Sequence, residues 1–233
     1  RVDVVVHGGD LFHRPRVPPS LAYQGLAPLL EVAESGVPVL LVPGNHERSR
    51  IPHPRFGRHP RILIFDRPRV YDVRVRGVRV RFAGFPFERR VRTRFPELLG
   101  RTGWRPDPAS PSVLCMHQCV EGATVGPSDF TFTTGDDVVR AGDLPPGLSA
   151  VLSGHIHRHQ VLTRDLTGRE LRAPVLYPGS VERTSLAERD EPKGYLVVEL
   201  DPGSGTPPRW TFHRLPARPM LVRELDVNGR SGT

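Results

Sequence analysis

The first part of the chain alternates between short apolar runs and stretches of helical or turn-forming residues. Residues 2–6 are mostly β-branched and apolar, which predicts a short buried strand. Leucine and alanine then recur at helical spacing, with Ser20 as the expected N-cap and Gly36 as the residue that ends the helix. Residues 39–42 form a second apolar run. A strand, a helix and another strand in this order predict a parallel sheet.

Residues 70–82 alternate between apolar and polar side chains on either side of Arg76-Gly77. This pattern predicts a β-hairpin with a two-residue turn and its apolar residues on one face. The same register places Arg74 opposite Arg79 on the other face. We interpret that face as solvated rather than as a patch that contacts phosphate.

The remaining apolar runs predict further strands, interrupted by one long loop. Residues 117–149 are rich in Gly, Thr, Asp and Pro, which predicts a long functional loop with one short helix. Residues 201–208 form a turn-rich break near the end of the chain. Strands are predicted at residues 62–65, 112–116, 150–152, 161–162, 175–177 and 195–200, with one or two more within 210–227.

Composition favours a globular protein with a polyanionic partner. Lys and Arg together number 33 and Asp and Glu number 25, which gives a net charge of +8. The two cysteines rule out a disulfide framework, and no apolar run approaches the ~20 residues that a membrane span needs. We therefore expect a cytoplasmic protein that does not act at a membrane.

Four of the predicted strands end in residues of the same chemical kind. Ligands of open α/β sheets bind outside the carboxyl ends of the strands, so these residues are expected to converge. One carboxylate, one amide oxygen and several imidazoles form a mixed oxygen and nitrogen set that suits Mn, Fe or Zn. Taken singly, each would be interpreted as a turn residue or a structural histidine. The converging residues are Asp10, Asn45, His46, His117, His155 and His157.

These strand-end motifs resemble those of the calcineurin-like metallophosphoesterases. The resemblance rests on residues 9–13 (GDLFH), 44–47 (GNHE), His117 and 154–157 (GHIH). Two later stretches, residues 177–183 (YPGSVER) and 193–195 (KGY), are similar to the SbcD-type DNA repair exonucleases. The resemblance covers roughly residues 1–227. It implies an α/β fold, a four-layer α/β/β/α metallophosphoesterase sandwich with mixed sheets.

The resemblance also implies which residues hold metal. Asp10 would bridge two divalent ions, and His157 would bind the first of them. Asn45, His117 and His155 would complete the second. Mn2+ is the expected metal, with Mg2+, Fe2+ or Zn2+ as alternatives. Two such ions can clamp a phosphate and activate water for in-line attack.

Catalytic and substrate-binding residues are implied beside the metal ligands. His46 would contact the phosphate and protonate the leaving group, a general-acid role. His13 would lie near the scissile phosphate as a secondary catalytic residue. Four arginines in the neighbouring loops would contact DNA phosphates, with simple solvation as an equal alternative. These arginines are Arg14, Arg16, Arg48 and Arg50.

The other histidines and the cysteines are interpreted as structural. His159 follows His157 at strand spacing, so proximity to the site is the alternative for this histidine. Cys115 and Cys119 flank His117 without a zinc-finger spacing. The remaining structural histidines are His7, His53, His59 and His213.

One motif of the family does not precede Asp10 in this sequence. The family carries Asp-x-His on its first strand, where the pair supplies two ligands to the first metal. Because Arg1 leads directly into a strand, we expect an N-terminal truncation, with a degenerate first site as the alternative. Residues 1–205 would then form a nuclease domain without its first strand, and 206–233 would begin a cap or linker segment. A smaller departure is Glu47, where Asp is commoner.

The expected function is that of a metal-dependent DNA exonuclease, with endonuclease activity as a further expectation, in DNA repair and recombination. The resemblance implies an SbcC-like ATPase partner and a homodimer. Two alternatives remain open from the residues alone. One is another calcineurin-like phosphodiesterase or phosphatase that acts on a small or protein substrate. The other is a non-catalytic subunit that binds DNA ends.

Overall fold

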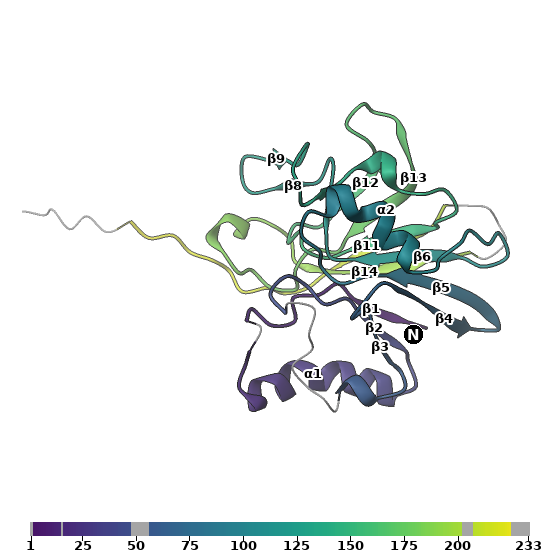
Figure 1. Cartoon of the computed structure of the whole chain (residues 1–233). Coiled ribbons are helices and arrows are strands. Elements are labelled where there is room, and N and C mark those ends of the chain that lie inside the picture. The colour runs from purple at the N-terminus through teal and green to yellow at the C-terminus, as the bar shows by residue number, and fades with distance from the viewer. Residues whose placement is uncertain (1, 15, 48–55, 202–206, 225–233) are drawn as a thin grey trace, which may run out of the picture.

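Two β-sheets pack face to face, and a helix covers the outer face of each (Figure 1). The computed structural model describes residues 2–14, 16–47, 56–201 and 207–224. In Figure 1 the layers run from α1 through the three-stranded sheet and the six-stranded sheet to α2. The predicted four-layer α/β/β/α order is confirmed.

The smaller sheet is parallel, with the strand order β1-β2-β3. Its strands are β1 (Val5–His7), β2 (Val39–Leu41) and β3 (Ile62–Ile64), and α1 (Pro19–Glu34) packs on its outer face. The parallel pairing follows from the strand–helix–strand pattern of the sequence. Gly36 ends α1 with a φ of +96°, a conformation that glycine adopts without strain.

The start of α1 differs from the prediction. Ser20 lies inside the helix, and Pro18 occupies the N-cap position without a side-chain hydrogen bond. Pro19 forms the first turn, where its fixed φ suits the helix and its missing N–H costs nothing. The prediction of Ser20 as the cap was wrong because proline at the start of the helix replaced side-chain capping.

The larger sheet is mixed, with the order β12-β13-β11-β6-β5-β4. Its four central strands are parallel, whereas the two edge strands, β4 and β12, are antiparallel to their neighbours. Helix α2 (Val91–Arg101) packs on the outer face. The strands are β4 (Arg69–Val75), β5 (Val78–Gly84), β6 (Ser112–Met116), β11 (Ala150–Ser153), β12 (Gln160–Arg164) and β13 (Glu170–Tyr177).

The hairpin β4–β5 has the register that its alternation predicts. Arg74 pairs with Arg79, and the apolar residues face the core between the sheets. The two turn residues Arg76 and Gly77 both have positive φ, as a type I′ turn requires. On the opposite face Arg74 is exposed, while Arg79 forms an ion pair with Asp107. The solvated face therefore carries ion pairs as well as free side chains.

The long loop after β6 contains short strands as well as the expected single turn of helix. Its strands β7 (Cys119–Val120) and β10 (Val138–Val139) pair in parallel, and β8 (Thr124–Val125) and β9 (Phe130–Thr131) form a small hairpin. The helical turn is η2 (Ala141–Asp143). Elsewhere, η1 spans Phe56–Arg58.

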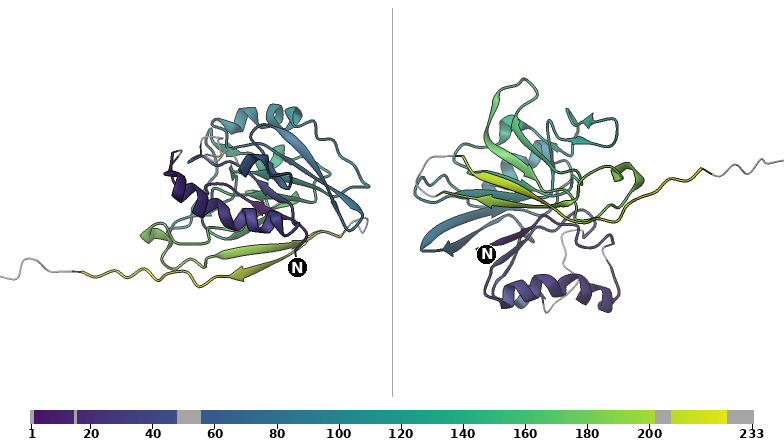
Figure 2. Two further views of the ribbon diagram at one scale, coloured as in Figure 1. Left: turned by 90° about the horizontal axis from the view of Figure 1, so that it is seen from below. Right: turned by 180° about the vertical axis from the view of Figure 1, so that it is seen from behind.

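The last described part of the chain is a hairpin followed by an extended segment. Strand β14 (Gly194–Glu199) pairs with β15 (Arg209–Arg214), and between residues 210 and 224, where the described part of the predicted range ends, β15 is the one strand. Seen from behind, the hairpin crosses the middle of the molecule on the side nearest the viewer, and the segment after β15 runs past η3 (Leu186–Glu188) (Figure 2). Of the helices described, none is both long and apolar enough to cross a membrane.

Candidate metal centre

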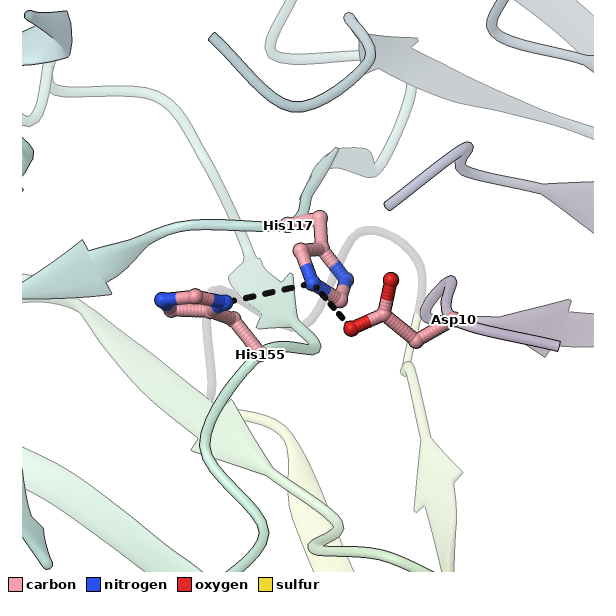
Figure 3. Close-up of side chains that lie close together, drawn as sticks. All are labelled: Asp10, His117 and His155. Carbon is pink, nitrogen blue, oxygen red and sulfur yellow. Dashed lines mark hydrogen bonds and ion pairs between the residues drawn. The ribbon is translucent and has the colours of Figure 1, made fainter. Parts of the chain in front are cut away.

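Loops from four strand ends meet where the two sheets come together. Asp10 follows β1, Asn45 follows β2, His117 follows β6 and His155 follows β11. All four strands present their carboxyl ends to this place, which is where α/β sheets bind ligands. Figure 3 shows Asp10, His117 and His155 pointing toward one another. The structure therefore joins residues that lie far apart in the sequence.

Glycines allow these loops to approach one another. The backbones of Gly8 and Gly154 are in contact, and a Cβ on Gly154 would overlap the carbonyl oxygen of Gly8. A Cβ on Gly44 would overlap the carboxylate of Asp10. Any larger residue at these two glycines would push the strand ends apart. The glycines of the motifs thus set the spacing of the site.

Two of the converging residues have a backbone conformation that residues other than glycine rarely adopt. Asp10 has a φ of +55° and His155 a φ of +76°. Positive φ costs free energy for residues other than glycine, and such strain is concentrated at functional sites. At both positions the strained backbone aims a candidate metal ligand at the same point.

The protonation of His117 follows from its hydrogen bond to Gly8. Its Nδ1 lies 2.6 Å from the Gly8 carbonyl oxygen, which can only accept, so Nδ1 carries the proton. In the neutral ring Nε2 then presents a lone pair. Nε2 lies 3.1 Å from Oδ2 of Asp10 and 3.0 Å from Oδ1 of Asn45. This backbone support for a histidine is typical of metal ligands.

His155 faces the same point with a neutral ring. Its Nδ1 lies 3.0 Å from Oδ1 of Asn45 and 3.3 Å from Nε2 of His117. Burial, together with the neighbouring His117, lowers the pKa of His155 to about 4. The imidazole is therefore uncharged at neutral pH, and one of its two ring nitrogens carries a lone pair that a metal ion can use.

Asp10 supplies the negative charge of the cluster. Burial alone would raise its pKa, but the neighbouring His117 and the backbone N–H of His46 outweigh burial and lower the pKa below its usual value. The carboxylate is therefore ionised at neutral pH, and it can only accept hydrogen bonds.

The resulting donor set fits a divalent cation. Ligand atoms of Asp10, His117 and His155 all lie within 4.8 Å of one another, and Oδ1 of Asn45 lies among them. The carboxylate oxygen, the amide oxygen and Nε2 of His117 all present lone pairs toward a common point. A cation satisfies these lone pairs together, and this mixture of oxygen and nitrogen suits Mn, Fe or Zn.

Glu47 holds the two loops that carry Asp10 and Asn45. Its carboxylate accepts the backbone N–H groups of Gly44, Asp10, Leu11 and Phe12. The residue is 1% exposed, and burial raises its pKa, although the hydrogen bonds from Gly44 and Leu11 oppose the shift. The sequence pattern did not indicate this role. The only available signal was an acidic residue directly after the Gly-Asn-His motif.

His46 and His13 lie together at the solvent side of the cluster. Nδ1 of His46 lies 3.0 Å from the His13 carbonyl oxygen, and the two rings stack with their centroids 4.7 Å apart. The backbone N–H of His46 donates to Oδ1 of Asp10 at 3.0 Å. Nε2 of His46 lies 3.9 Å from Oδ2 of Asp10. The two predicted catalytic histidines are thus adjacent to the ligand set.

Two further residues line the site without having been predicted to do so. The ring centroid of Phe87 lies 5.7 Å from that of His155 and 6.1 Å from that of His117, which gives the site an apolar wall. Nδ1 of His7 accepts the backbone N–H of Gly9 at 3.2 Å. Burial lowers the pKa of His7 to about 4, and His117 adds to the shift. The interpretation of His7 as a structural strand-end residue fits this contact.

His157 lies outside the group of converging ligand atoms. Its Nδ1 is 3.0 Å from Oε1 of Glu188. Burial would raise the pKa of Glu188, but hydrogen bonds from Lys193, His157 and Thr184 outweigh burial and lower the pKa to about 2. The structure therefore brings together four of the five predicted metal ligands and gives His157 a separate carboxylate partner.

The remaining predicted residues are more loosely placed. Arg14 and Arg16 are exposed in the loop after β1, and Arg48 and Arg50 lie outside the described residues. The ring of His159 stacks on Phe212 at 4.0 Å, which supports the structural interpretation of that histidine.

Comparisons with known proteins agree with this geometry. The family described as calcineurin-like phosphoesterase matches residues 1–159. The chain is 28% identical over 227 residues to the DNA double-strand break repair protein Mre11 of Methanopyrus kandleri, covering 87% of this chain and 46% of the relative. It is 30% identical over 246 residues to Mre11 of Haloferax volcanii, covering 99% and 47%. A third relative, Mre11 of Aeropyrum pernix, is 25% identical over 250 residues, covering 97% and 54%.

The chain spans about half the length of these curated relatives. The family match covers more than half of the chain and includes all the strand-end motifs at Asp10, Asn45, His117 and His155. The family predicted from these motifs is confirmed, and the chain belongs to the calcineurin-like phosphoesterases.

Proposed function

We propose that the protein hydrolyses phosphodiester bonds of DNA as a metal-dependent exonuclease, with endonuclease activity at the same site, in DNA repair. The observation that carries this proposal is the convergence of four metal-ligating side chains directly beside His46. The names of the relatives, which describe DNA double-strand break repair, support DNA as the substrate. The net charge of +8 favours a polyanionic substrate.

Each metal ligand has a proposed place in a two-metal site. Asp10 would be shared between two divalent ions, Asn45, His117 and His155 would hold the second, and His157 would hold the first. The Asp-x-His pair of the family, which adds two ligands to the first ion, does not precede Asp10 in this sequence. Mn2+ suits the mixed donor set best, with Mg2+, Fe2+ or Zn2+ as alternatives. When bound, the ions would polarise the phosphate and lower the pKa of the attacking water.

His46 is the proposed general acid. The His13 carbonyl accepts from Nδ1–H, so in the imidazolium form Nε2 gives its proton to the leaving oxygen and is left with a lone pair. His13, stacked against that ring, is proposed to hold His46 in place and to contact the scissile phosphate. The exposed Arg14 and Arg16 are proposed to contact DNA phosphates. The same role is proposed for Arg48 and Arg50.

The broader assignments are proposals of the same kind. DNA, an SbcC-like ATPase and a second copy of the chain are the proposed partners, and the cytoplasm is the proposed location. Residues 1–205 are the proposed nuclease domain, and 206–233 are the proposed start of a cap or linker. Strand β15, beyond this boundary, pairs with β14 and would join the two parts.

The test uses the protein encoded by the complete open reading frame. It compares two substrates, linear duplex DNA and bis(p-nitrophenyl) phosphate. With Mn2+ present, we expect cleavage of linear duplex DNA and a fall of about 10²- to 10⁴-fold in the rate for His46→Ala, because the leaving oxygen loses its proton donor. His46→Ala should retain Mn2+ and DNA binding. His213→Ala is the control, because that ring stacks on Tyr195 in the β14–β15 hairpin.

Two outcomes would replace the proposal. Cleavage of bis(p-nitrophenyl) phosphate without cleavage of DNA would indicate a phosphodiesterase for small substrates. Salt-sensitive DNA binding with no hydrolysis at any metal concentration would indicate a non-catalytic subunit that binds DNA ends.

A further inference from the structure

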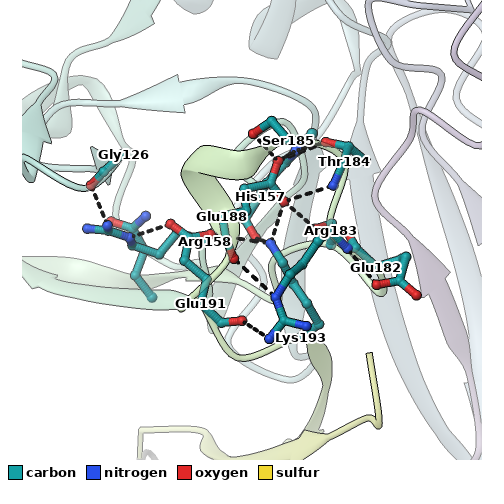
Figure 4. Close-up of polar contacts among 12 residues, drawn as sticks. Gly126, His157, Arg158, Glu182, Arg183, Thr184, Ser185, Glu188, Glu191 and Lys193 are labelled. Carbon is teal, nitrogen blue, oxygen red and sulfur yellow. Dashed lines mark hydrogen bonds and ion pairs between the residues drawn. The ribbon is translucent and has the colours of Figure 1, made fainter. Parts of the chain in front are cut away.

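His157 is held by a carboxylate that several other groups also hold. Oε1 of Glu188 accepts hydrogen bonds from Nδ1 of His157 at 3.0 Å, from Thr184 at 2.8 Å and from Ser185 at 3.2 Å. Figure 4 shows these side chains gathered around the carboxylate, which η3 carries. Because three donors share one oxygen, the position of Glu188 does not depend on any single contact.

The only lysine of the chain completes this arrangement. Lys193 is fully buried, and its Nζ lies 2.6 Å from Oε2 of Glu188 and 3.3 Å from Oε2 of Glu191. Nζ also donates to the backbone carbonyl of His157 at 3.0 Å. One ammonium group therefore fixes both the backbone of His157 and the carboxylate that receives its ring.

The contact with Glu188 decides which nitrogen of His157 is free. The carboxylate can only accept, so Nδ1 carries the proton and Nε2 presents a lone pair. The side chain is 42% exposed, so part of the ring lies outside the contacts with Glu188 and Thr184. Histidines that bind metals commonly donate their other N–H to a carboxylate in this way.

We propose that Glu188, anchored by Lys193, is a positioning residue that holds His157 in the Nδ1–H tautomer with Nε2 directed toward a divalent cation. The proposal rests on the proposed function, because it takes His157 as a ligand of the first metal. It adds residues of the segment 184–193 to a site that the strand-end motifs alone define.

Glu188→Gln is the informative substitution, because it keeps the volume and polarity of the side chain. The amide must turn its oxygen to the Lys193 ammonium, which leaves its NH2 group facing Nδ1 of His157. Nδ1 must then accept, so the proton moves to Nε2 and blocks the nitrogen that binds metal. Glu191→Gln is the matched control, because the Glu191 carboxylate contacts Lys193 and Arg158 rather than the His157 ring.

The first measurement needs no metal. Nitrogen-15 NMR of the imidazoles in chelator, with His157→Ala to assign the signal, reports the tautomer directly. We expect Nδ1–H in the wild type and in Glu191→Gln, and Nε2–H in Glu188→Gln. A Glu188→Gln protein that keeps Nδ1–H would overturn the proposal. Thermal unfolding of each variant checks that the fold is retained.

The second measurement is Mn2+ binding to the protein encoded by the complete open reading frame. Electron paramagnetic resonance of the free ion monitors the binding. His157→Ala should remove one Mn2+-binding site. We expect Glu188→Gln to lower the Mn2+ affinity of that same site by about 10- to 100-fold. Glu191→Gln should weaken Mn2+ binding far less, because Glu191 contacts Lys193 and Arg158 rather than the His157 ring. The double variant Glu188→Gln/His157→Ala should bind Mn2+ no more weakly than His157→Ala alone, since both changes act through one ligand.

The outcomes separate this inference from the proposed function. One outcome is that Glu188→Gln lowers Mn2+ affinity equally in the wild type and in His157→Ala. That result would show that Glu188 has a purely structural role and would overturn the inference. If His157→Ala leaves Mn2+ binding unchanged, then His157 is no ligand and the inference fails with that assignment. DNA cleavage that depends on His46 would still support the proposed function in either case.

Discussion

Two groups of side chains use the same residue types in opposite ways. The Asp10 cluster consists of Asp10, Asn45, His117 and His155. The Glu188 network consists of His157, Arg158, Thr184, Ser185, Glu188, Glu191 and Lys193. Around Asp10, a carboxylate, an amide oxygen and the Nε2 lone pair of His117 face one another. Around Glu188, the carboxylate meets an ammonium, two hydroxyls and the protonated nitrogen of His157. The first region has more acceptors than protons, whereas the second has a donor for each acceptor. The balance of protons, not the kinds of residue, marks the place for a cation.

The two regions also differ in how the chain builds them. The cluster gathers residues from β1, β2, β6 and β11, so it exists only when both sheets are packed. The network lies mainly within residues 182–193, with His157 and Arg158 reaching it from the loop before β12. We therefore expect the network to stabilise the metal-free protein and the cluster to stabilise it only through bound metal.

The largest expected effect is the loss of the buried ammonium. Lys193→Met should lower the free energy of unfolding by about 3–5 kcal/mol, because Glu188 keeps a buried charge without its partner. Urea unfolding in the presence of a chelator measures this. Arg189→Met is the control, since the exposed Arg189–Asp190 pair contributes about 0–1 kcal/mol. Equal effects of the two changes would mean that the network adds nothing beyond a surface ion pair.

The next effect should appear only when metal is present. At free Mn2+ 100 times its Kd, the wild type should gain about 2.7 kcal/mol of unfolding free energy. Asp10→Asn should lose this gain, because the cluster loses its negative charge. In chelator the same variant should match or exceed the wild type, since its amide can donate to Nε2 of His117 and remove the conflict between acceptors.

Thermal unfolding with and without Mn2+ checks this behaviour. The wild-type gain corresponds to a rise in Tm of roughly 5–10 °C for a chain of this size. Asp72→Asn is the matched control, because Asp72 pairs with arginines on the hairpin face and should leave the gain intact. An Asp10→Asn protein that is strongly destabilised in chelator would contradict the view that the cluster depends on metal.

How much of this could be predicted from the sequence differs between the two regions. The cluster was predictable because strand ends of α/β sheets converge, and Asp10, Asn45, His117 and His155 each follow an apolar run. The hairpin register around Arg76-Gly77 was equally predictable, because alternation and a two-residue turn allow only one pairing.

The supporting residues could not be predicted in the same way. Glu47 and Glu188 lie in loops without periodicity, and their roles depend on backbone N–H groups and side chains that only the folded chain brings near them. The prediction of Ser20 as the helix cap failed for a different reason. Two neighbouring signals were present, and the helix begins at Pro19 rather than after Ser20. Local patterns predict elements, whereas hydrogen-bond partners across loops need the assembled structure.

A smaller effect is expected for the residue that holds the cluster's backbone. Glu47→Gln places an amide NH2 against backbone N–H groups that need an acceptor, which should cost about 2 kcal/mol of unfolding free energy. Mn2+ affinity should fall as well, because these N–H groups belong to the loops of Asp10 and Asn45. Urea unfolding and Mn2+ titration measure the two effects.

The exposed Glu97 offers the control for that substitution. Glu97 pairs with Arg101 on the surface of α2, so Glu97→Gln should change neither quantity appreciably. A Glu47→Gln protein with normal stability and normal Mn2+ affinity would show that the loops hold their positions without this carboxylate.

The smallest effect should come from removing one of the donors to Glu188. Ser185→Ala deletes the 3.2 Å hydrogen bond but leaves those from Thr184, His157 and Lys193. We expect a loss of about 0.5–1 kcal/mol in unfolding free energy and no change in the His157 tautomer, because the carboxylate remains fixed by its other partners. Urea unfolding and imidazole NMR test this. A tautomer change in Ser185→Ala would mean that the network has no redundancy and is as sensitive to single losses as the cluster.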